Sequence, residues 1–312
     1  MKPLICACLA AVVALGPTLL CLGAETPSPR AGLAFKPVGE EFIFDTGLLS
    51  GRLRAEKRGL GLTSVKYSSS GQTLSRSTGL LGVYRVFGNG KRFGTAAWDW
   101  PSEASLQPDG SVIVKCAATP ERPFAFQGTY QWVDRATLEL EIQVAPQKDL
   151  AHFEAFVSSY FDPAFTNSLG YVRALPGKPN QPGWLHADRS LGEWLMFPRD
   201  KAAVALIQDG RWTLEPNPVK WIILPELAYP LGVRRAPAAG LSAIVMAPGK
   251  DCFALATPYE TEGHYSTYLS LFGRDLKAGD LAKTKVRLQF LDTLDERRIL
   301  EAYEVFRKGL AP

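Results

Sequence analysis

The feature that most constrains this chain is the repeated alternation of apolar and polar residues with a period of two. Between positions 137 and 144, for example, Leu138, Leu140 and Ile142 are each flanked by polar residues. Because successive side chains of a β-strand point to opposite faces, this pattern predicts strands with one buried face. It recurs at 124–132 and 283–290, and further strands are predicted at 41–45, 64–68, 82–87, 111–117, 153–161, 203–207, 219–224, 241–247 and 264–272.

Turn-forming residues separate these runs, as at positions 88–90, 108–110 and 278–280. The chain contains 28 glycines and 23 prolines, a composition that opposes a helical bundle. Many short strands separated by such turns are typical of antiparallel sandwiches and barrels. We therefore predict an all-β fold, a large antiparallel β-sandwich that forms a single domain over residues 40–312.

One helix is predicted, at the C-terminus, over residues 294–308. Thr293 and Glu296 have the spacing of a capping box. Ile299, Tyr303 and Phe306 then recur at helical spacing, and Gly309 is suited to the C-cap. We expect this helix to pack its apolar side on the sandwich.

The first 24 residues have the pattern of a cleavable secretion signal. Lys2 precedes the apolar run 4–22, and the small residues Gly23 and Ala24 follow it. A charged start, an apolar middle and small residues at the cleavage site are typical of signal peptides. We predict cleavage after Ala24, a flexible N-terminal segment over residues 25–39, and a periplasmic or secreted protein. Lipidation at Cys21 and a retained anchor helix are the alternatives.

Signal removal leaves 34 basic and 31 acidic residues, mixed along the chain without basic blocks. This distribution disfavours a nucleic-acid partner, and it disfavours a membrane partner once the signal is cleaved. The mature chain keeps Cys116 and Cys252, which could form a disulfide or be two buried small hydrophobic residues. No cysteine or histidine cluster has metal-ligand spacing, so no metal or cofactor is expected. The oligomeric state stays open.

Histidines and one glutamate are the candidates for acid–base chemistry. Glu154 shares a predicted strand face with His152, and His264 begins a polar strand face that also carries Tyr268. Such groups can exchange protons near neutral pH. The alternatives are a hydrogen-bonded structural pair for Glu154 and a solvated sheet face for His264. His186 lies in the irregular region 167–218, where long functional loops are expected.

Aromatic residues beside polar ones indicate carbohydrate binding. Arg85, Trp98 and Trp100 form one such group. Tryptophan rings stack on sugar faces while polar groups bond the hydroxyls, and the alternative is that these tryptophans belong to the core. Trp132 and Trp221 are interpreted as core residues. A second group consists of Trp184, His186, Asp188, Arg189, Glu193 and Trp194.

The C-terminal run from Gly263 to Asp280, with the strand Thr284–Leu291 after it, resembles the last strands of galactose-mutarotase-like β-supersandwich domains. This resemblance implies a large twisted antiparallel sandwich with a carbohydrate-binding sheet. Epimerase members of the family open and close a hexose ring with histidines and a glutamate. The chain lacks their Asn-His-x-x-Phe-Asn-Leu segment. Beyond the family, it looks like uncharacterised exported bacterial proteins.

The leading hypothesis is an exported carbohydrate-binding or carbohydrate-processing protein. If the protein is an enzyme, Glu154 is expected to act as the base and His264 or His186 as the acid. Separate substrate-binding residues would hold the carbohydrate. Convergence of Glu154, His186 and His264 on one cleft would favour an enzyme, and their separation would favour a non-catalytic binding or scaffold module. A polysaccharide-lyase-like enzyme, with a tyrosine beside a histidine and an arginine, is the third alternative. The expected substrate-binding residues are Arg85, Trp98, Trp100, Tyr160 and Tyr268.

Overall fold

The computed structural model describes residue 1, residues 32–55, residue 59 and residues 61–310. Residues 2–24 of the predicted signal peptide lie outside the described part, as do residues 25–31 of the predicted flexible segment. The remainder of that segment contains strand β1 (Lys36–Val38), all three residues of which are exposed. Among the described residues, no helix is both long and apolar enough to cross a membrane.

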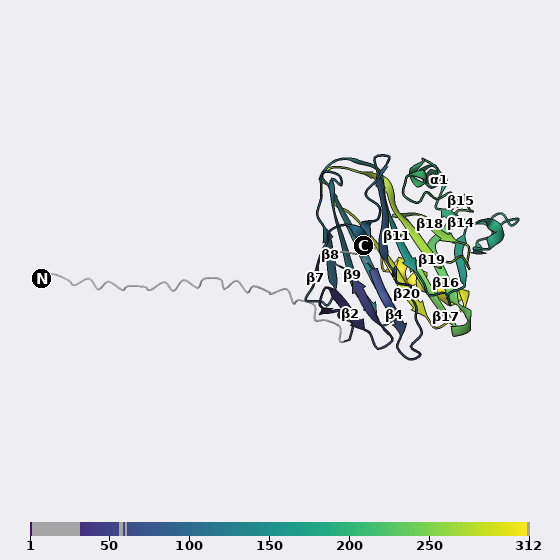
Figure 1. Ribbon diagram of the computed structural model, residues 1–312, viewed down its shortest axis with the longest axis horizontal. Coiled ribbons are helices and arrows are strands. Elements are labelled where there is room, and N and C mark those ends of the chain that lie inside the picture. Colours follow the sequence, from purple (N-terminus) through teal and green to yellow (C-terminus); the bar gives the residue numbers. More distant parts are fainter. Residues whose placement is uncertain (2–31, 56–58, 60, 311–312) are drawn as a thin grey trace.

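In the part of the chain that the structure describes, twenty strands form three sheets, and every strand pair there is antiparallel except β14 with β15 (Figure 1). The four-stranded sheet has the order β1, β2 (Glu41–Asp45), β3 (Leu49–Arg54) and β4 (Gly61–Tyr67). The nine-stranded sheet has the order β13 (Gly183–His186), β12 (Asn167–Val172), β16 (Leu227–Ala236), β17 (Leu241–Met246), β20 (Ala282–Leu291), β10 (Thr137–Pro146), β9 (Phe124–Asp134), β8 (Val112–Cys116) and β7 (Glu103–Leu106). The seven-stranded sheet has the order β15 (Ile222–Ile223), β14 (Trp194–Pro198), β18 (Cys252–Pro258), β19 (Ser266–Leu276), β11 (Leu150–Tyr160), β5 (Gly82–Gly88) and β6 (Lys91–Arg92).

The predicted fold class is confirmed: the two large sheets enclose one apolar core. Leu138, Leu140 and Ile142 of β10 lie in the same buried cluster as Val157 of β11 and Leu269 of β19. The alternation read from the sequence thus turns one face of each sheet inward. Sheet-on-sheet packing of this kind is typical of β-sandwiches.

The C-terminal helix α2 (Glu296–Lys308) covers part of the opposite face of the nine-stranded sheet. Ile299, Tyr303 and Phe306 are buried there against strands β12, β16 and β17. The helix and its Gly309 C-cap are confirmed, but the predicted capping box is wrong. The Asp295 side chain accepts the N-cap bond from the Arg297 amide, while Thr293 accepts from the Asp295 amide. Thr293 therefore stabilises the turn before the helix.

Two predicted strands are wrong, and both lie in the segment that covers the other face of the seven-stranded sheet. Residues 203–207 belong to helix α1 (Lys201–Ile207), because Asp200 caps the helix by accepting from the Ala203 amide. Of residues 219–224, only Ile222–Ile223 form a strand. Helix α1 and strand β15 lie beside β14 and β18 in Figure 1. A short apolar run does not distinguish helix from strand.

Cys116 and Cys252 are both buried free thiols, which settles the alternatives that the sequence left open. Burial raises the pKa of Cys116 to about 11 and that of Cys252 to about 12. Both residues therefore behave as small core residues. Within the described part of the chain, no group of three or more histidine, cysteine, aspartate or glutamate side chains could hold a metal ion.

Candidate functional site

A cleft of about 380 Å³ lies on the outer face of the seven-stranded sheet, the face turned away from the sandwich core. One side is formed by strands β5, β11, β14 and β19, and the other by residues 212–221. This volume falls within the range of small-molecule sites, about 300–1,000 Å³. The lining residues are Tyr84, Arg85, Phe156, Tyr160, Trp194, Trp212, Asn217, Pro218, Val219, Trp221, His264 and Tyr268.

A β-bulge places two consecutive residues of β5 in this cleft. Phe156 lies opposite Arg85, but the next residue, Val157, lies opposite Val83, which leaves Tyr84 as the extra residue. Strict alternation would turn either Tyr84 or Arg85 into the core. The bulge turns both outward, and bulges re-aim side chains in this way next to functional sites.

Arg85 is the most unusual group in the cleft because it is a buried charge with incomplete hydrogen bonding. Its side chain is 3% exposed, and its Nη2 donates to the main-chain oxygen of Asn217 at 2.8 Å. Among the described residues, its Nε and Nη1 have no hydrogen-bond partner. The guanidinium lies 5.0 Å from the ring centre of Tyr84 and 5.2 Å from that of Trp212. Buried donors without acceptors are costly, so this arrangement is suited to a ligand that accepts.

A chain of hydroxyl groups crosses the floor of the cleft. Ser266 Oγ donates to Tyr268 Oη at 2.7 Å, and Tyr268 Oη lies 3.4 Å from Tyr160 Oη. Burial raises the pKa of Tyr268 to about 12 and raises that of Tyr160 as well. Both phenols therefore stay protonated at neutral pH. With Tyr268 donating to it, Tyr160 is left able to donate to a ligand oxygen.

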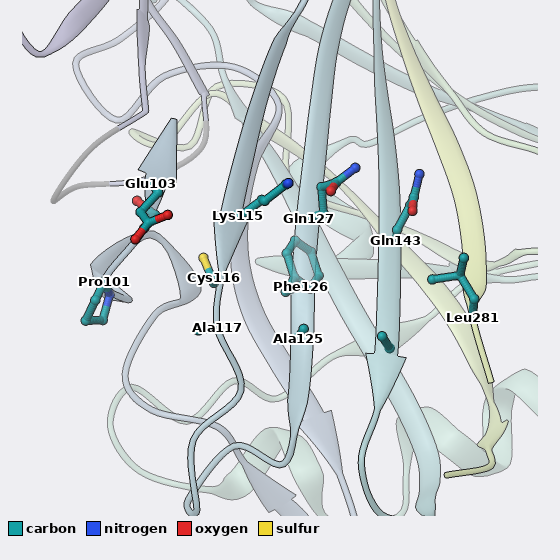
Figure 2. A pocket seen from close by; sticks show the side chains of 12 residues that line it. Pro101, Glu103, Lys115, Cys116, Ala117, Ala125, Phe126, Gln127, Gln143 and Leu281 are labelled. Carbon is teal, nitrogen blue, oxygen red and sulfur yellow. The ribbon is translucent and has the colours of Figure 1, made fainter. Parts of the chain in front are cut away.

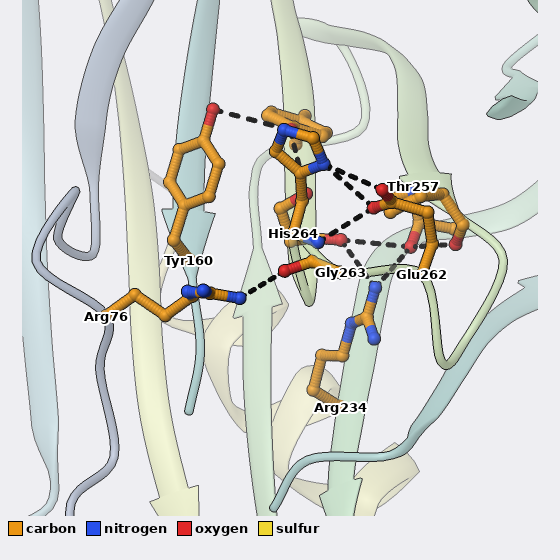
Figure 3. Close-up of polar contacts among 10 residues, drawn as sticks. Arg76, Tyr160, Arg234, Thr257, Glu262, Gly263 and His264 are labelled. Atoms are coloured by element: carbon orange, nitrogen blue, oxygen red, sulfur yellow. Dashed lines mark hydrogen bonds and ion pairs between the residues drawn. The ribbon is translucent and has the colours of Figure 1, made fainter. Parts of the chain in front are cut away.

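His264 lies at the rim of the cleft, held by a carboxylate (Figure 3). Its Nδ1 is 2.9 Å from both carboxylate oxygens of Glu262, and its main-chain amide donates to the same group at 2.8 Å. This pairing occupies Nδ1, and among the described residues no hydrogen bond engages Nε2. The predicted strand 264–272 begins only at Ser266, because Tyr265 has a left-handed backbone conformation with φ of 49°.

Arginine side chains hold the loop that carries Glu262 and His264. Arg234, which is fully buried, donates to the main-chain oxygens of Glu260 and Ser266, both at 2.8 Å. Arg76 donates to the main-chain oxygen of Gly263 (Figure 3). A catalytic or binding histidine needs such support from neighbouring groups to keep one geometry.

Aromatic rings form the walls of the cleft. Trp212 and Trp221 pack edge to face with ring centres 5.2 Å apart, and Trp194 packs against Trp221 at 6.0 Å. The Nε1 atoms of Trp212 and Trp221 are buried without an acceptor among the described residues. Trp221, interpreted from the sequence as a core residue, is half-buried: it packs against the buried cluster on this face of the sheet and also lines the cleft. Trp132, in contrast, is buried against Phe44 as expected.

Glu154 lies on the same strand face as Phe156 and Tyr160 but does not line the cleft. It is completely buried, and its Oε2 accepts from Arg211 Nη1 at 2.8 Å. Arg211 also pairs with Asp209 at 2.7 Å. Burial raises the pKa of the Glu154 carboxyl, and the charge of Arg211 opposes this shift. Because Arg211 precedes Trp212 in the chain, the ion pair fixes the wall of the cleft.

The other predicted site residues are dispersed. His186, on edge strand β13, is half-exposed and lies 3.8 Å from Glu260, outside the cleft. Trp98 stacks on Tyr84 with ring centres 4.4 Å apart but is not one of the residues that line the cleft. Trp100 is buried beneath Arg122, 4.1 Å from the guanidinium carbon to its ring centre. The structure thus brings together Arg85, Tyr160, Tyr268 and His264, and it separates them from Glu154, His186 and Trp100.

Sequence reasoning missed Trp212, Asn217 and Glu262. Trp212 and Trp221 flank a proline-containing loop at the end of the region expected to hold functional loops. This position was the sequence feature that could have indicated Trp212 as a site residue. Glu262 precedes His264 by two residues, but only the turn between them brings the carboxylate onto the ring.

A second groove, of about 590 Å³, lies at strands β7, β8, β9 and β10 of the nine-stranded sheet (Figure 2). Lys115, Gln127 and Gln143 form a cross-strand row in its lining, with Ala125 and Leu281 beside them. Although larger, this groove contains no tryptophan or tyrosine and no buried unpartnered polar side chain among the described residues. The aromatic cleft is therefore the better candidate site.

No protein-family model and no curated protein matches the chain. Among solved structures, the Slr1438 protein from Synechocystis sp. PCC 6803 is 14% identical, with 85% of this chain and 99% of that chain covered at a TM-score of 0.51. A "putative aldose 1-epimerase" from Klebsiella pneumoniae is 10% identical, with coverages of 88% and 86% and a TM-score of 0.48. The alpha-N-acetylgalactosaminidase NagBb from Bifidobacterium bifidum is 14% identical, with coverages of 89% and 39% and a TM-score of 0.48. At 14% identity, the match to Slr1438 shows a shared fold and nothing about activity. Nothing about this chain is concluded from the other two matches, whose TM-scores are below 0.5.

Proposed function

We propose that this protein binds carbohydrate in the aromatic cleft and acts outside the cytoplasm, as a member of the galactose-mutarotase-like supersandwich family. The observation that carries the proposal is the combination of tryptophan walls with buried donors that lack acceptors, namely Arg85 and the indoles of Trp212 and Trp221. Sugars offer both an apolar ring face and hydroxyl acceptors, so they suit a pocket with aromatic walls and a few polar groups.

A glycan array with the mature protein, residues 25–312, tests binding, followed by calorimetric titration of the best ligand. Trp221→Ala should weaken that ligand by about 3–10-fold, the usual worth of an aromatic contact. Trp184→Ala is the matched control, because Trp184 is half-buried on edge strand β13 of the nine-stranded sheet and does not line the cleft. Equal affinities of Trp221→Ala and wild type would contradict the assignment of the cleft.

A second candidate function is proton transfer to or from the bound sugar by His264. The specific observation in its favour is the Glu262 carboxylate on Nδ1, which orients the ring and supports its positive charge after proton uptake. Tyr160 and Tyr268 lie beside it as neutral donors, and Arg85 completes the tyrosine, histidine and arginine set of the lyase-like alternative. Glu154 has a positioning role in this account.

Product analysis after incubation with the best ligand tests this step. His264→Gln should retain binding and abolish conversion, because glutamine keeps a hydrogen-bonding group but cannot exchange protons near neutral pH. His186→Gln provides the comparison, since His186 also lies near a glutamate but outside the cleft. Conversion by His264→Gln at the wild-type rate would overturn the catalytic role, and loss in His186→Gln would favour the dispersed residues instead.

A further inference from the structure

Resting on the proposed carbohydrate cleft, we infer that the ligand carries an anionic group and that this group binds Arg85. The class of ligand is therefore an acidic saccharide, whose oxyanion is a carboxylate, a sulfate or a phosphate. Positive charge without a counter-charge lies in and beside the cleft, whichever sugar ring is bound.

The imbalance involves two arginines. Arg85 lines the cleft, and Arg92 approaches it from β6, where its guanidinium carbon lies 5.7 Å from the ring centre of Tyr84. Arg92 donates to the main-chain oxygens of Pro216, at 2.6 Å, and of Thr95, and its buried Nε has no partner among the described residues. Within the described part of the chain, neither arginine forms an ion pair with a carboxylate. Burial and the charge of Arg85 both lower the pKa of Arg92, so the two cations disfavour each other.

Two other buried arginines, Arg211 and Arg234, differ from Arg85 because partners engage both of their terminal nitrogens. Arg211 pairs with Glu154 and Asp209. Arg234 donates to three oxygens through its two terminal nitrogens at 2.8–3.0 Å. Arg85, by contrast, makes one hydrogen bond, to a neutral oxygen. A buried charge without a counter-charge is strongly disfavoured, so a ligand anion would restore the missing partner.

The geometry around Arg85 suits an oxyanion attached to a ring. The guanidinium lies between the rings of Tyr84 and Trp212, which leaves its edge as the accessible donor surface. Planar guanidinium groups bind carboxylate, sulfate-like and phosphate oxygens through paired N–H bonds. The Trp221 indole and the Tyr160 hydroxyl line the same cleft and can bond the hydroxyls of the attached sugar.

Calorimetric titration with matched saccharides tests the inference. The set contains a hexuronate trisaccharide, its carboxyl-reduced neutral counterpart, a sulfated oligosaccharide and a hexose phosphate. The wild-type protein should bind at least one acidic member at least tenfold more tightly than the neutral trisaccharide, and the preferred member identifies the oxyanion. Arg85→Gln should remove this preference, because it should weaken binding of the acidic ligand at least tenfold more than binding of the neutral trisaccharide.

Two further variants keep the test decisive. Arg85→Lys retains the charge and should retain part of the preference, and it provides the readout if Arg85→Gln does not fold. Arg52→Gln removes an exposed positive charge on β3, in the four-stranded sheet and not in the cleft lining, and should bind as wild type.

Equal wild-type affinities for acidic and neutral saccharides would overturn the inference and leave the carbohydrate cleft intact. Equal weakening of both ligands by Arg85→Gln would overturn it too. If none of the saccharides binds and no hit appears on the glycan array, the proposed function fails and the inference fails with it.

Discussion

Arg211 and Arg85 lie near the same tryptophan and are almost equally buried, at 5% and 3% exposed, but their partners differ. Arg211 has two carboxylates within 2.8 Å. Arg85 has one main-chain oxygen, and two of its nitrogens lack partners among the described residues. The first arginine is a completed part of the structure, whereas the second is a binding group whose partner comes from outside.

This difference separates structural from functional charge in a protein whose sequence offers many candidates. Glu154 is a polar residue on a functional strand face, but its ion pair with Arg211 occupies it. Burial of a charge is thus a poor guide to function, while burial without partners is a better one. The comparison can be tested by substitutions in the structural ion pair of Arg211 and by substitutions in the cleft that contains Arg85.

The largest expected effect is on the structural side. Glu154→Gln removes one of the two carboxylates paired with the buried Arg211 and leaves Asp209 as its counter-charge, so we expect a loss of about 3 kcal/mol, the lower end for a broken buried ion pair. Urea-induced unfolding at neutral pH measures this change in the free energy of unfolding. Glu139→Gln is the control: Glu139 contacts Lys285 and Arg287 on the more accessible face of β10, and we expect a loss of about 1 kcal/mol. A loss for Glu154→Gln no larger than that of Glu139→Gln would remove the structural role.

The next effect concerns the buried phenols of the cleft. The folded protein raises the pKa of Tyr268 from 10.0 to about 12, so the folded state holds a proton that the unfolded state releases above pH 10. Stability from this group is therefore complete below pH 10 and is lost as the pH rises toward 12, by about 1.4 kcal/mol per pH unit. Unfolding free energies of wild type and Tyr268→Phe between pH 8 and 11.5 measure it. Parallel curves for the two proteins would show that Tyr268 has an ordinary pKa.

The smallest effect is on the functional side. Arg85→Gln removes a buried charge that has no counter-ion, so the free energy of unfolding should stay within about 1 kcal/mol of the wild-type value. Arg211→Gln, the same substitution next to Trp212, should lose about 3 kcal/mol or more because it leaves Glu154 buried and unpaired. Thermal and urea unfolding of the two variants side by side measure the contrast. Equal losses would show that Arg85 is as structural as Arg211.

The sequence predicted the sandwich because the alternation of apolar residues is local and strong. Strands such as β10 and β20 could be read directly from it, as could the apolar side of the C-terminal helix. The run 203–207 could not be assigned, because five apolar residues fit a helix turn as well as a strand and Asp200 decided between them. Arg85, Tyr160, Tyr268 and His264, which were predicted as site residues, all line the cleft, and strand alternation places Tyr160 and Tyr268 there.

The rest of the site depends on features that have no local signature. The bulge at Tyr84 changes which side chains face outward, and it is visible only in the pairing of β5 with β11. Trp100 and Trp98 are two residues apart in a short 3-10 turn and its cap, where strand alternation does not apply. The partner of Glu154 is 57 residues away in the chain.

A crystal structure of residues 25–312 with the best-binding acidic oligosaccharide tests the central claim most directly. The account predicts a sugar ring against Trp221 and Trp212, with its oxyanion within hydrogen-bond distance of Nε or Nη1 of Arg85. A saccharide bound instead in the groove beside Lys115 and Gln127, or in the cleft with its oxyanion turned away from Arg85, would contradict it.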